Sequence, residues 1–473
     1  ENKVEKKLKC RKCISKKREA KNRIRKHKRN LNRISRQNAK NIVLQLWKTI
    51  NHFFPDLFEK IKGIEDHRNK SEYELVELIV ACIFMMMVKS GSRNAFNNDK
   101  NTAYFEDNYY KLFKMRIPHM DTVNDVMCKL EEEELELLKA HMIRSLLIKK
   151  TLHKFRLFKE YFMIAIDGTG IMSSSKRHCE HCLTKTSKSG KTTYFHNILE
   201  AKLICSNGFA ISLMTEWIEN PDGNFDKQDA ELKAFLRLAP KLHKMYPRLP
   251  ICITADGLYP NQTFFSVCKK YNWSYIVTFK DGNLPSVWDE VRILKDIISD
   301  NSCKQTEVIK KNRICNEYTW INRINYKGFL VNWIKCIETT QQIESQEEES
   351  HRFVHLTDME IDRNKAAPIS KGGRLRWKIE NEGFNSQKNQ GYNLKHKFSR
   401  VNLTAAKNYY QCIQIAHLIN QLIILSNKFK ALLKGKITIQ HLWFIMTGYL
   451  IFGQLDESEI EQLSACRIQV RFE

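Results

Sequence analysis

Two short apolar segments, each followed directly by Asp-Gly, constrain the fold of this chain more than any other feature. Residues 161–166 lead into Asp167, and residues 249–255 lead into Asp256. Their length and composition predict strands that are buried on both faces and end in a turn. An acid at such a position is held rigidly at the edge of a sheet, where metal ions and substrates commonly bind. A single Asp-Gly usually only begins a turn, but the second copy favours a functional pair.

The pattern around these acids predicts an α/β fold with a ribonuclease-H-like mixed sheet and flanking helices. Three antiparallel strands would be followed by two parallel strands, with a helix before each of the last two. In that layout the first and fourth strands are neighbours, so Asp167 and Asp256 would lie side by side. Besides the two acid-bearing strands, we expect strands at 194–205, 209–217 and 274–279 and helices at 227–244 and 260–271.

Composition and periodicity divide the chain into six segments. A β-rich insertion, with strands expected near 306–309, 318–321 and 329–334, interrupts the catalytic core, and residues 341–350 read as an acidic, Gln-rich connector. The segments are a basic DNA-binding arm (1–40), a helical region interpreted as a DNA-binding domain (41–155), the first part of the core (156–300), the insertion (301–349), the second part of the core (350–400) and C-terminal helices (401–473).

The charge of the chain points to a polyanionic partner. The formal net charge is +26, and residues 1–40 alone hold 18 Lys or Arg and 3 Glu. A charge run is usually only a solvated surface, but so one-sided an arm favours binding to the phosphates of double-stranded DNA, which would order it. The arm residues expected to contact DNA include Lys16, Lys17, Arg18 and Arg25.

Hydropathy and cysteine usage favour a cytoplasmic protein, nucleoid-associated in a prokaryote, and no membrane partner. The most apolar run, residues 78–88, is too short to cross a bilayer, and the polar, basic start carries no export signal. The 14 cysteines are scattered, which favours reduced thiols over disulfides. Because the first residue is Glu, we expect that the natural chain begins further upstream.

A cluster of cysteines and histidines after Asp167 has the spacing of a zinc site. Cys179 and Cys182 are separated by two residues, and His196 follows. Either His178 or His181 would complete a tetrahedral set, which would be structural because no open position is apparent. The alternative is a polar hairpin with incidental thiols. A second pair, Cys10 and Cys13, is weak evidence because zinc needs four ligands.

The segment 372–385 predicts a buried helix that carries a third acid. Arg376, Glu380 and Phe384 share one face at helical spacing, whereas Glu382 points roughly 200° round the axis from Glu380. The alternative is an ordinary ion pair on a surface helix. With two Asp at strand ends, one Glu here could help to hold two Mg²⁺ or Mn²⁺ ions, the arrangement that catalyses phosphodiester displacement.

The chain over residues 160–400 resembles the DDE transposases of bacterial insertion sequences, of the type with a β insertion before the Glu. Four stretches carry the resemblance in the right order: IAIDGTGI, KQDAELKAFLRL, ITADGLYPNQ and RLRWKIENEGFNSQKNQGYNLKH. The resemblance implies that Asp167, Asp256 and Glu380 form the catalytic triad on an RNase H-like fold. It further implies Mg²⁺-dependent cleavage and strand transfer at inverted-repeat ends, with a homodimer in the working complex.

The resemblance also has departures. Related transposases carry a Tyr-x2-Arg-x3-Glu-x6-Lys signature on the Glu helix, in which Arg376 would contact DNA phosphate or the transition state. Here Gly373 stands at the Tyr position and Gln387 at the Lys position, with Lys388 one residue late. In a regular helix Lys388 would lie about 80–100° off the face of Glu380, so its role as a DNA contact depends on the local geometry. The Cys179, Cys182 and His196 cluster resembles a feature of close relatives.

Two other functions remain open. One is a transposase-derived protein that binds element ends without cutting, although the intact set of three acids argues against decay. The other is a metal-dependent nuclease without strand transfer, which would use the same acids. The ability of a pre-cut end to join a second duplex distinguishes the transposase from the nuclease.

Overall fold

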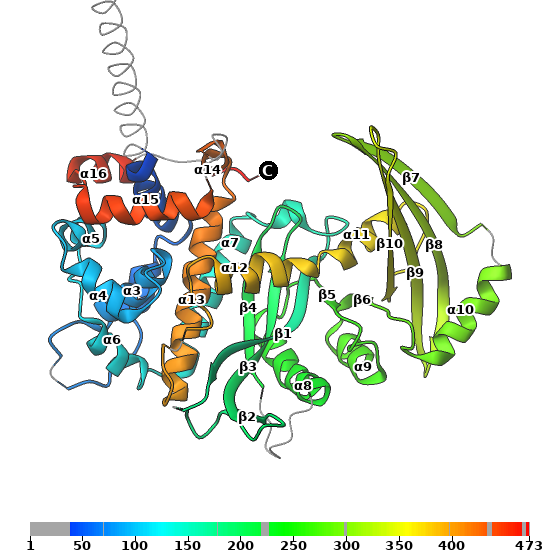
Figure 1. The fold of residues 1–473 in the computed structure, drawn as a ribbon, viewed down its shortest axis with the longest axis horizontal. Helices are drawn as coiled ribbons and strands as arrows, with labels where there is room; N and C mark the ends of the chain where they lie inside the picture. The colour runs from blue at the N-terminus through cyan, green and yellow to red at the C-terminus, as the bar shows by residue number, and fades with distance from the viewer. Residues whose placement is uncertain are drawn as a thin grey trace, which may run out of the picture.

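The computed structural model describes residues 38–472 with the exception of 70, 177, 219–226, 298–299, 397, 433–437 and 466–469. Its centre is a ten-stranded mixed sheet flanked by helices, which confirms the α/β class (Figure 1). The predicted DNA contacts Lys16, Lys17, Arg18 and Arg25, and the pair Cys10 and Cys13, lie outside the described residues. No helix in the described ranges is long and apolar enough to cross a membrane.

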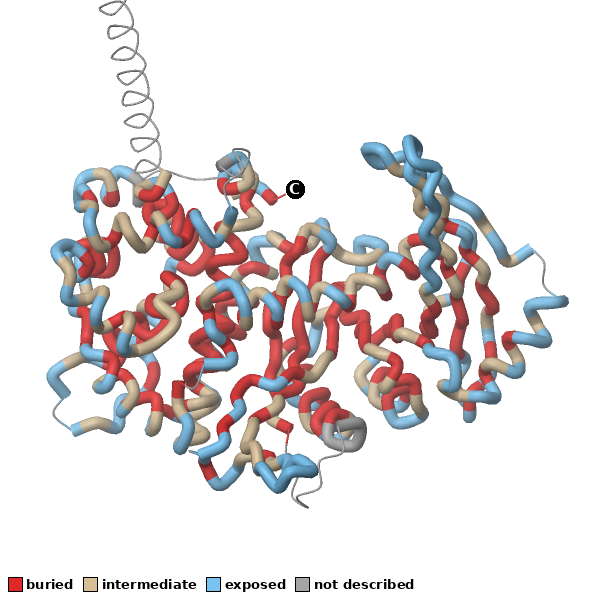
Figure 2. The backbone as a smooth tube through the Cα atoms, viewed as in Figure 1, coloured by how far each residue is buried: buried red, intermediate tan, exposed pale blue. Residues whose placement is uncertain are grey.

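The segment between residues 38 and 155 is helical, as predicted, but it does not have a core of its own. A long buried helix, α13 (Leu403–Ile424), contacts α3, α6, α7 and strand β4, so one apolar cluster runs from these helices into the sheet (Figure 2). The helices are 38–53, α2 (Leu57–Lys62), α3 (Leu75–Met87), α4 (Arg93–Lys100), α5 (Phe105–Phe113), α6 (Met120–Met127) and α7 (Glu132–Ile148).

Five strands form the part of the sheet that carries the first two acids. Their order is β4-β3-β1-β5-β6, with β4, β3 and β1 antiparallel and with β1, β5 and β6 parallel, as the sequence predicted. The short β2 (Leu183–Thr186) shares an edge of β3 with β4. The bounds are β1 (Phe162–Ser174), β3 (Thr192–Ile204), β4 (Ala210–Trp217), α8 (Lys227–Met245), β5 (Ile251–Ala255), α9 (Gln262–Tyr271) and β6 (Ser274–Thr278).

The prediction that the first strand ends in a turn after Asp167 is wrong. Strand β1 continues to Ser174, and Asp167 lies opposite Glu200 of β3. The strand continues because residues 168–174 keep pairing with β3, through a register shift between Gly170 and Met172. Strand β5 does end at Ala255, directly before the second acid.

The three strands of the predicted insertion, β7, β8 and β9, and the strand β10 that follows them extend the central sheet. Strand β10 pairs antiparallel with β6 on one side and with β9 on the other, so the expected boundary at residue 349 falls inside β10. Residues 341–350 are therefore not a connector but the end of a hairpin. Its side chains are polar and mostly exposed, and only its backbone is paired. Hydrophobic periodicity therefore does not indicate a strand there. The bounds are α10 (Pro285–Ile297), β7 (Ser302–Ile309), β8 (Asn312–Tyr326), β9 (Phe329–Gln342) and β10 (Glu348–Thr357).

After β10 the chain passes back over the sheet, and the described residues beyond 401 are mainly helical, as the sequence predicted for 401–473. Helix α11 packs on β10, β6 and β9, and the π-helix η2 that follows contacts β1, β3 and β4. The bounds are α11 (Ala366–Arg374), η2 (Ile379–Asn385), α12 (Ser386–Asn389), α14 (Asn427–Leu432), α15 (Ile439–Phe452) and α16 (Glu457–Ala465).

The contact between α11 and the sheet leaves no room for a side chain at Gly373. A Cβ there would lie 2.4 Å from Cδ2 of His355 and 2.9 Å from Cγ2 of Ile276. Both neighbours are buried, and burial also lowers the pKa of His355 to about 4, so the ring is neutral at pH 7. The Tyr of the transposase signature therefore has no place here, because His355 fills the space.

We expect Gly373→Ala to destabilise the protein, because overpacking costs about 1–3 kcal/mol and exceeds the roughly 1 kcal/mol that alanine contributes in a helix. The matched control is Gly448→Ala in α15, where a Cβ meets nothing within 4 Å. That variant should be neutral or more stable. Thermal and urea unfolding measure both, and equal effects of the two substitutions would contradict the close contact.

Candidate functional site

The two predicted Asp residues lie beyond the last pairs of two neighbouring parallel strands. Pairing of β1 with β5 ends at Ala165 and Thr254, two positions before Asp167 and Asp256 respectively. Asp167 accepts the backbone N–H of Gly168 at 3.1 Å, and Asp256 accepts the N–H of Leu258 at 2.8 Å. The register therefore brings both acids to the same edge, as the sequence predicted for neighbouring strands.

Arg376 connects the third acid to the first. Its Nη1 lies 3.2 Å from Oε1 of Glu380 and 3.6 Å from Oδ2 of Asp167. The guanidinium is buried, and it stacks on the exposed ring of Trp377. A single cation between two carboxylates holds the helix of Glu380 against β1, which is more than the surface ion pair considered as the alternative.

The electrostatics of Asp167 reflect a crowded acidic site. Burial raises its pKa to about 7, and the negative charges of Glu380, Glu231 and Asp256 act in the same direction. The positive charges of Arg376 and Lys388 oppose the shift. Such a carboxyl gains most from a cation, because positive charge would replace the water that burial removes.

Glu382, the neighbouring acid on the same segment, belongs to a different environment. Its Oε1 lies 2.6 Å from Nζ of Lys378, in an i, i+4 ion pair. It does not take part in the contacts of Arg376 with Asp167 and Glu380. The structure thus brings Glu380 to the first Asp and leaves Glu382 as a natural comparison.

The π-helix corrects the expected direction of Lys388. A π turn accommodates one extra residue. The eight steps from Glu380 to Lys388 therefore rotate about as far as seven steps of an α-helix, which is about 20° short of two full turns. Nζ of Lys388 donates to the hydroxyl of Thr169 at 2.5 Å, two residues from Asp167 on β1. Burial lowers the pKa of Lys388, whereas the carboxylates of Asp167 and Glu380 raise it.

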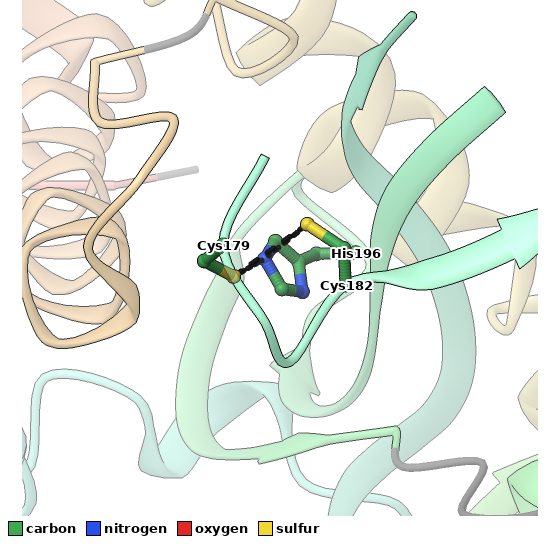
Figure 3. Close-up of side chains that lie close together, drawn as sticks. All are labelled: Cys179, Cys182 and His196. Carbon is green, nitrogen blue, oxygen red and sulfur yellow. Dashed lines mark hydrogen bonds between the residues drawn. The ribbon is translucent and has the colours of Figure 1, made fainter. Parts of the chain in front are cut away.

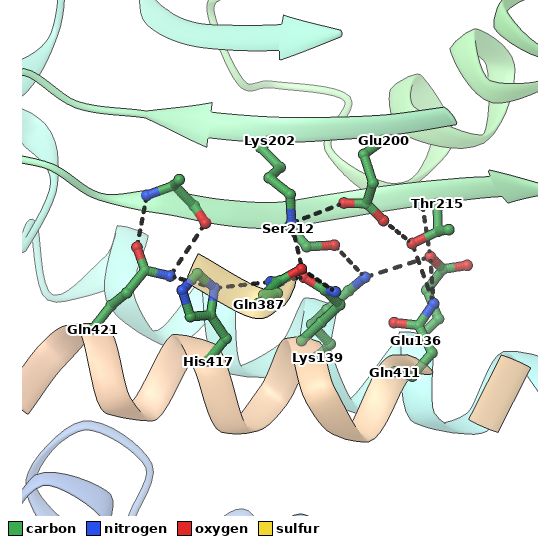
Figure 4. A network of polar contacts seen from close by, with 12 residues as sticks. Glu136, Lys139, Glu200, Lys202, Ser212, Thr215, Gln387, Gln411, His417 and Gln421 are labelled. Carbon is green, nitrogen blue, oxygen red and sulfur yellow. Dashed lines mark hydrogen bonds and ion pairs between the residues drawn. The ribbon is translucent and has the colours of Figure 1, made fainter. Parts of the chain in front are cut away.

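Gln387, which stands at the Lys position of the signature by number, points away from the acids. Its side chain is fully buried and exchanges two amide hydrogen bonds with Gln414 of α13, at 2.8 and 3.1 Å. It also lies 2.9 Å from Nδ1 of His417 (Figure 4). The one-residue delay of the Lys is therefore a consequence of the π turn.

The acids are spread wider than the ligands of one small cation. Among the described residues, only Cys179, Cys182 and His196 place three potential ligand atoms within 4.8 Å of one another. Two ions roughly 4 Å apart can use ligands on opposite sides, so the acidic oxygens suit a pair of hard divalent ions with Asp167 between the others. The residues that could hold such ions are Asp167, Asp256 and Glu380.

The predicted thiol and imidazole ligands do meet. The Cys179 and Cys182 Sγ atoms are 3.5 Å apart, and Nε2 of His196 lies 3.2 and 3.4 Å from them (Figure 3). These separations are close to the roughly 3.6–3.8 Å that zinc bond lengths give for neighbouring tetrahedral ligands. Burial lowers the pKa of His196 to about 4, so its ring is neutral and able to bind a metal at pH 7.

Of the two histidines considered as the fourth ligand, His178 is engaged elsewhere. Its ring stacks on Tyr194 with centroids 3.6 Å apart, and its Nδ1 bonds to the carbonyl oxygen of Cys179 at 3.1 Å. His181 is largely exposed and its charge acts on His196. The ring nitrogens of both histidines lie outside the group of ligand atoms within 4.8 Å of one another. Among the described residues, His181 is bound only to the exposed Glu180, at 3.4 Å, so we expect it to turn towards the site more easily than His178.

Sequence reasoning missed one buried acid at this site. Glu231 of α8 is 4% exposed, and its carboxylate lies against Gly168, the residue after Asp167. The only available signal was its place inside the stretch 227–238, one of the four that carry the resemblance.

The chain matches no protein-family model and no curated protein.

We expect the purified protein to hold about one zinc ion per chain, measured by elemental analysis. Cys182→Ser should release it and lower the melting temperature, because a structural zinc site contributes directly to folding. Lower pH should weaken zinc binding, because burial raises the pKa of Cys182 to about 12 and a thiol must lose its proton to bind.

The matched pair for the fourth ligand is His181→Ala and His178→Ala. Only the first should weaken zinc retention during dialysis against a chelator. Full retention by Cys182→Ser would contradict the site itself.

Proposed function

We propose that this protein is a DNA transposase of the DDE type, which uses divalent cations to cleave element ends and to transfer the strands. The single observation that carries this proposal is the convergence on one edge of β1. Asp167, Asp256 and Glu380 come from separate parts of the chain, and Lys388 joins them through the π turn. The order β4-β3-β1-β5-β6 is the one that an RNase H-like fold requires, and it supports the same conclusion.

The residues of the site have distinct roles in this proposal. Bound Mg²⁺ or Mn²⁺ ions would activate the attacking oxygen and stabilise the leaving oxygen of a phosphodiester. Arg376 orients Glu380 against Asp167 and presents positive charge to a phosphate at the site. Lys388, half-buried beside Thr169, adds a second donor on the same side.

Double-stranded DNA is the partner that the composition supports. The net charge of +26 is far above what a small substrate needs, and a basic arm suits the phosphates of element ends and of target DNA. Two ends must be processed together, so we propose a homodimer in the working complex. The proposed compartment is the cytoplasm of a prokaryote, where the nucleoid lies.

Two alternatives differ in the chemistry that follows DNA binding. A nuclease would use the same acids but would not join a 3′-hydroxyl to a second duplex. A DNA-binding protein without activity would tolerate loss of the acids, and the contacts that Asp167 and Glu380 share with Arg376 argue against such a loss. The decisive substrate is therefore a pre-cut element end with a free 3′-hydroxyl.

We expect wild-type protein to cleave and join its own element ends with Mg²⁺ or Mn²⁺, measured on labelled duplexes. Asp167→Asn and Asp256→Asn should abolish both steps while binding of the duplex stays near wild type. Glu380→Gln should behave like them, and Glu382→Gln should retain most activity because it pairs with Lys378 instead. Cleavage without joining would favour the nuclease, and equal loss in both Glu variants would contradict the assigned register.

The π turn makes a second prediction. Lys388→Gln should lower cleavage at least tenfold, because a charged hydrogen bond to a phosphate contributes about 1.5–3 kcal/mol. Moving the lysine to its numerical signature position, in the double variant Gln387→Lys with Lys388→Gln, should not restore activity, since position 387 faces α13. Recovery in the double variant would show that the segment is a regular α-helix.

A further inference from the structure

The carboxylates of Asp167 and Glu231 both lie against Gly168. Oδ1 of Asp167 accepts the N–H of Gly168 at 3.1 Å. Oε1 of Glu231 lies 2.5 Å, and its Cδ 2.9 Å, from where a Cβ of residue 168 would stand. Any side chain at position 168 would therefore displace Glu231. The buried acid of α8 is packed against the backbone that carries the first catalytic Asp.

These contacts set an upper limit on the distance between the two acids. Both are made to Gly168, so standard bond lengths place the two carboxylate oxygens less than about 9 Å apart. Two ions about 4 Å apart, each with oxygen ligands at about 2.1 Å, span about 8 Å from outer ligand to outer ligand. The limit is comparable to this span, so the geometry allows Glu231 to take part in a two-ion site that includes Asp167.

The sheet leaves this place accessible to groups from both of its faces. Pairing of β1 with β5 stops at Ala165, whereas β1 continues along β3 to Ser174. In the part of the chain that the structure describes, no strand covers the β5 side of β1 beyond that point. Because successive residues of a strand point to opposite faces, Glu231 lies on the face of position 168 and Asp167 points to the other face. The two acids can meet at a ligand only around this free edge of β1.

A buried hydroxyl points to a ligand at the same place. Tyr259 is 1% exposed, and its OH has no hydrogen-bond partner among the described residues. Its backbone N–H donates to the carbonyl oxygen of Asp256 at 3.2 Å, and its ring packs on Phe235, one turn after Glu231 on α8, with centroids 5.6 Å apart. Burial raises the pKa of Tyr259, and the charges of Glu231, Asp167 and Asp256 raise it further. A buried O–H without a partner is costly, and water or an ion with its bound water is the usual explanation.

We propose that Glu231 is a fourth acid of the cation site, and that Tyr259 donates a hydrogen bond to water bound there. This inference rests on the proposed function, because it assigns two further residues to the Asp167, Asp256 and Glu380 site. Glu231 contributes from the α8 side and Glu380 from the η2 side, with Asp167 between them. The site then holds its ions with four carboxylates instead of three.

The test measures metal binding instead of DNA cleavage. The full chain, saturated with zinc beforehand, is titrated with Mn²⁺, and free Mn²⁺ is followed by electron paramagnetic resonance. Asp167→Asn defines the background, and Asp289→Asn on α10, whose carboxylate pairs with Arg292 on the surface, is the control. Glu231→Gln should weaken Mn²⁺ binding about tenfold or more, Tyr259→Phe should weaken it less, and the control should bind like wild type.

A second variant keeps the test valid if glutamine disturbs folding. Glu231→Asp retains the charge but shortens the reach, so its affinity should fall between those of wild type and Glu231→Gln, with the melting temperature of each protein measured without Mn²⁺. Wild-type affinity in both Glu231 variants, together with loss in Asp167→Asn, would overturn the fourth acid and leave the proposed function intact. No Mn²⁺ binding above the Asp167→Asn background in wild type would overturn both.

Discussion

The early end of the pairing between β1 and β5 is the constraint on which the rest of the site depends. Beyond Ala165 and Thr254 the two strands no longer pair, so the edge of β1 that faced β5 is free at the site. Asp167 lies on this unpaired edge of β1, and Asp256 directly follows the last residue of β5. A longer β5 would pair with β1 beside Asp167 and close this edge to a ligand. The chemistry that we propose therefore depends on where one ladder of hydrogen bonds stops.

A buried polar network between β3 and α13 lies beside this site, on the face of the sheet to which Asp167 points. Glu200, which lies opposite Asp167 on β3, pairs with the fully buried Lys202 at 3.4 Å, and Lys202 donates to Gln414 of α13 at 2.8 Å (Figure 4). Buried ion pairs add little net stability, but removing one partner costs about 3–5 kcal/mol. The network thus favours one arrangement of β3 and α13. Gln387 bonds to the same Gln414. The helical segment that carries Lys388 is therefore connected through Gln414 to β3, the strand next to Asp167.

The sequence predicted the parts of the fold that depend on local pattern. Apolar runs identified β1, β3, β4, β5 and β6, and the expected strand layout predicted that Asp167 and Asp256 would be neighbours. The short polar strand β2 was not predicted. Prediction from the sequence failed where tertiary contacts overrule local signals. Asp-Gly at 167 looked like a turn, but pairing with β3 carries the strand to Ser174. The π turn depends on contacts at both ends of a helix, which periodicity does not contain, and Glu231 meets Gly168 only in three dimensions.

Two buried contacts fix the ends of the segment 373–387, which contains a turn at residues 375–376 and the π-helix η2. At its start, Gly373 must face His355 of β10, because no other residue fits there. At its end, Gln387 must face Gln414 and His417 of α13. A regular α-helix that satisfied the first contact would turn Lys388 about 80° from the direction of Glu380. One π turn absorbs the extra residue, so that both contacts hold while Glu380 and Lys388 face β1 together.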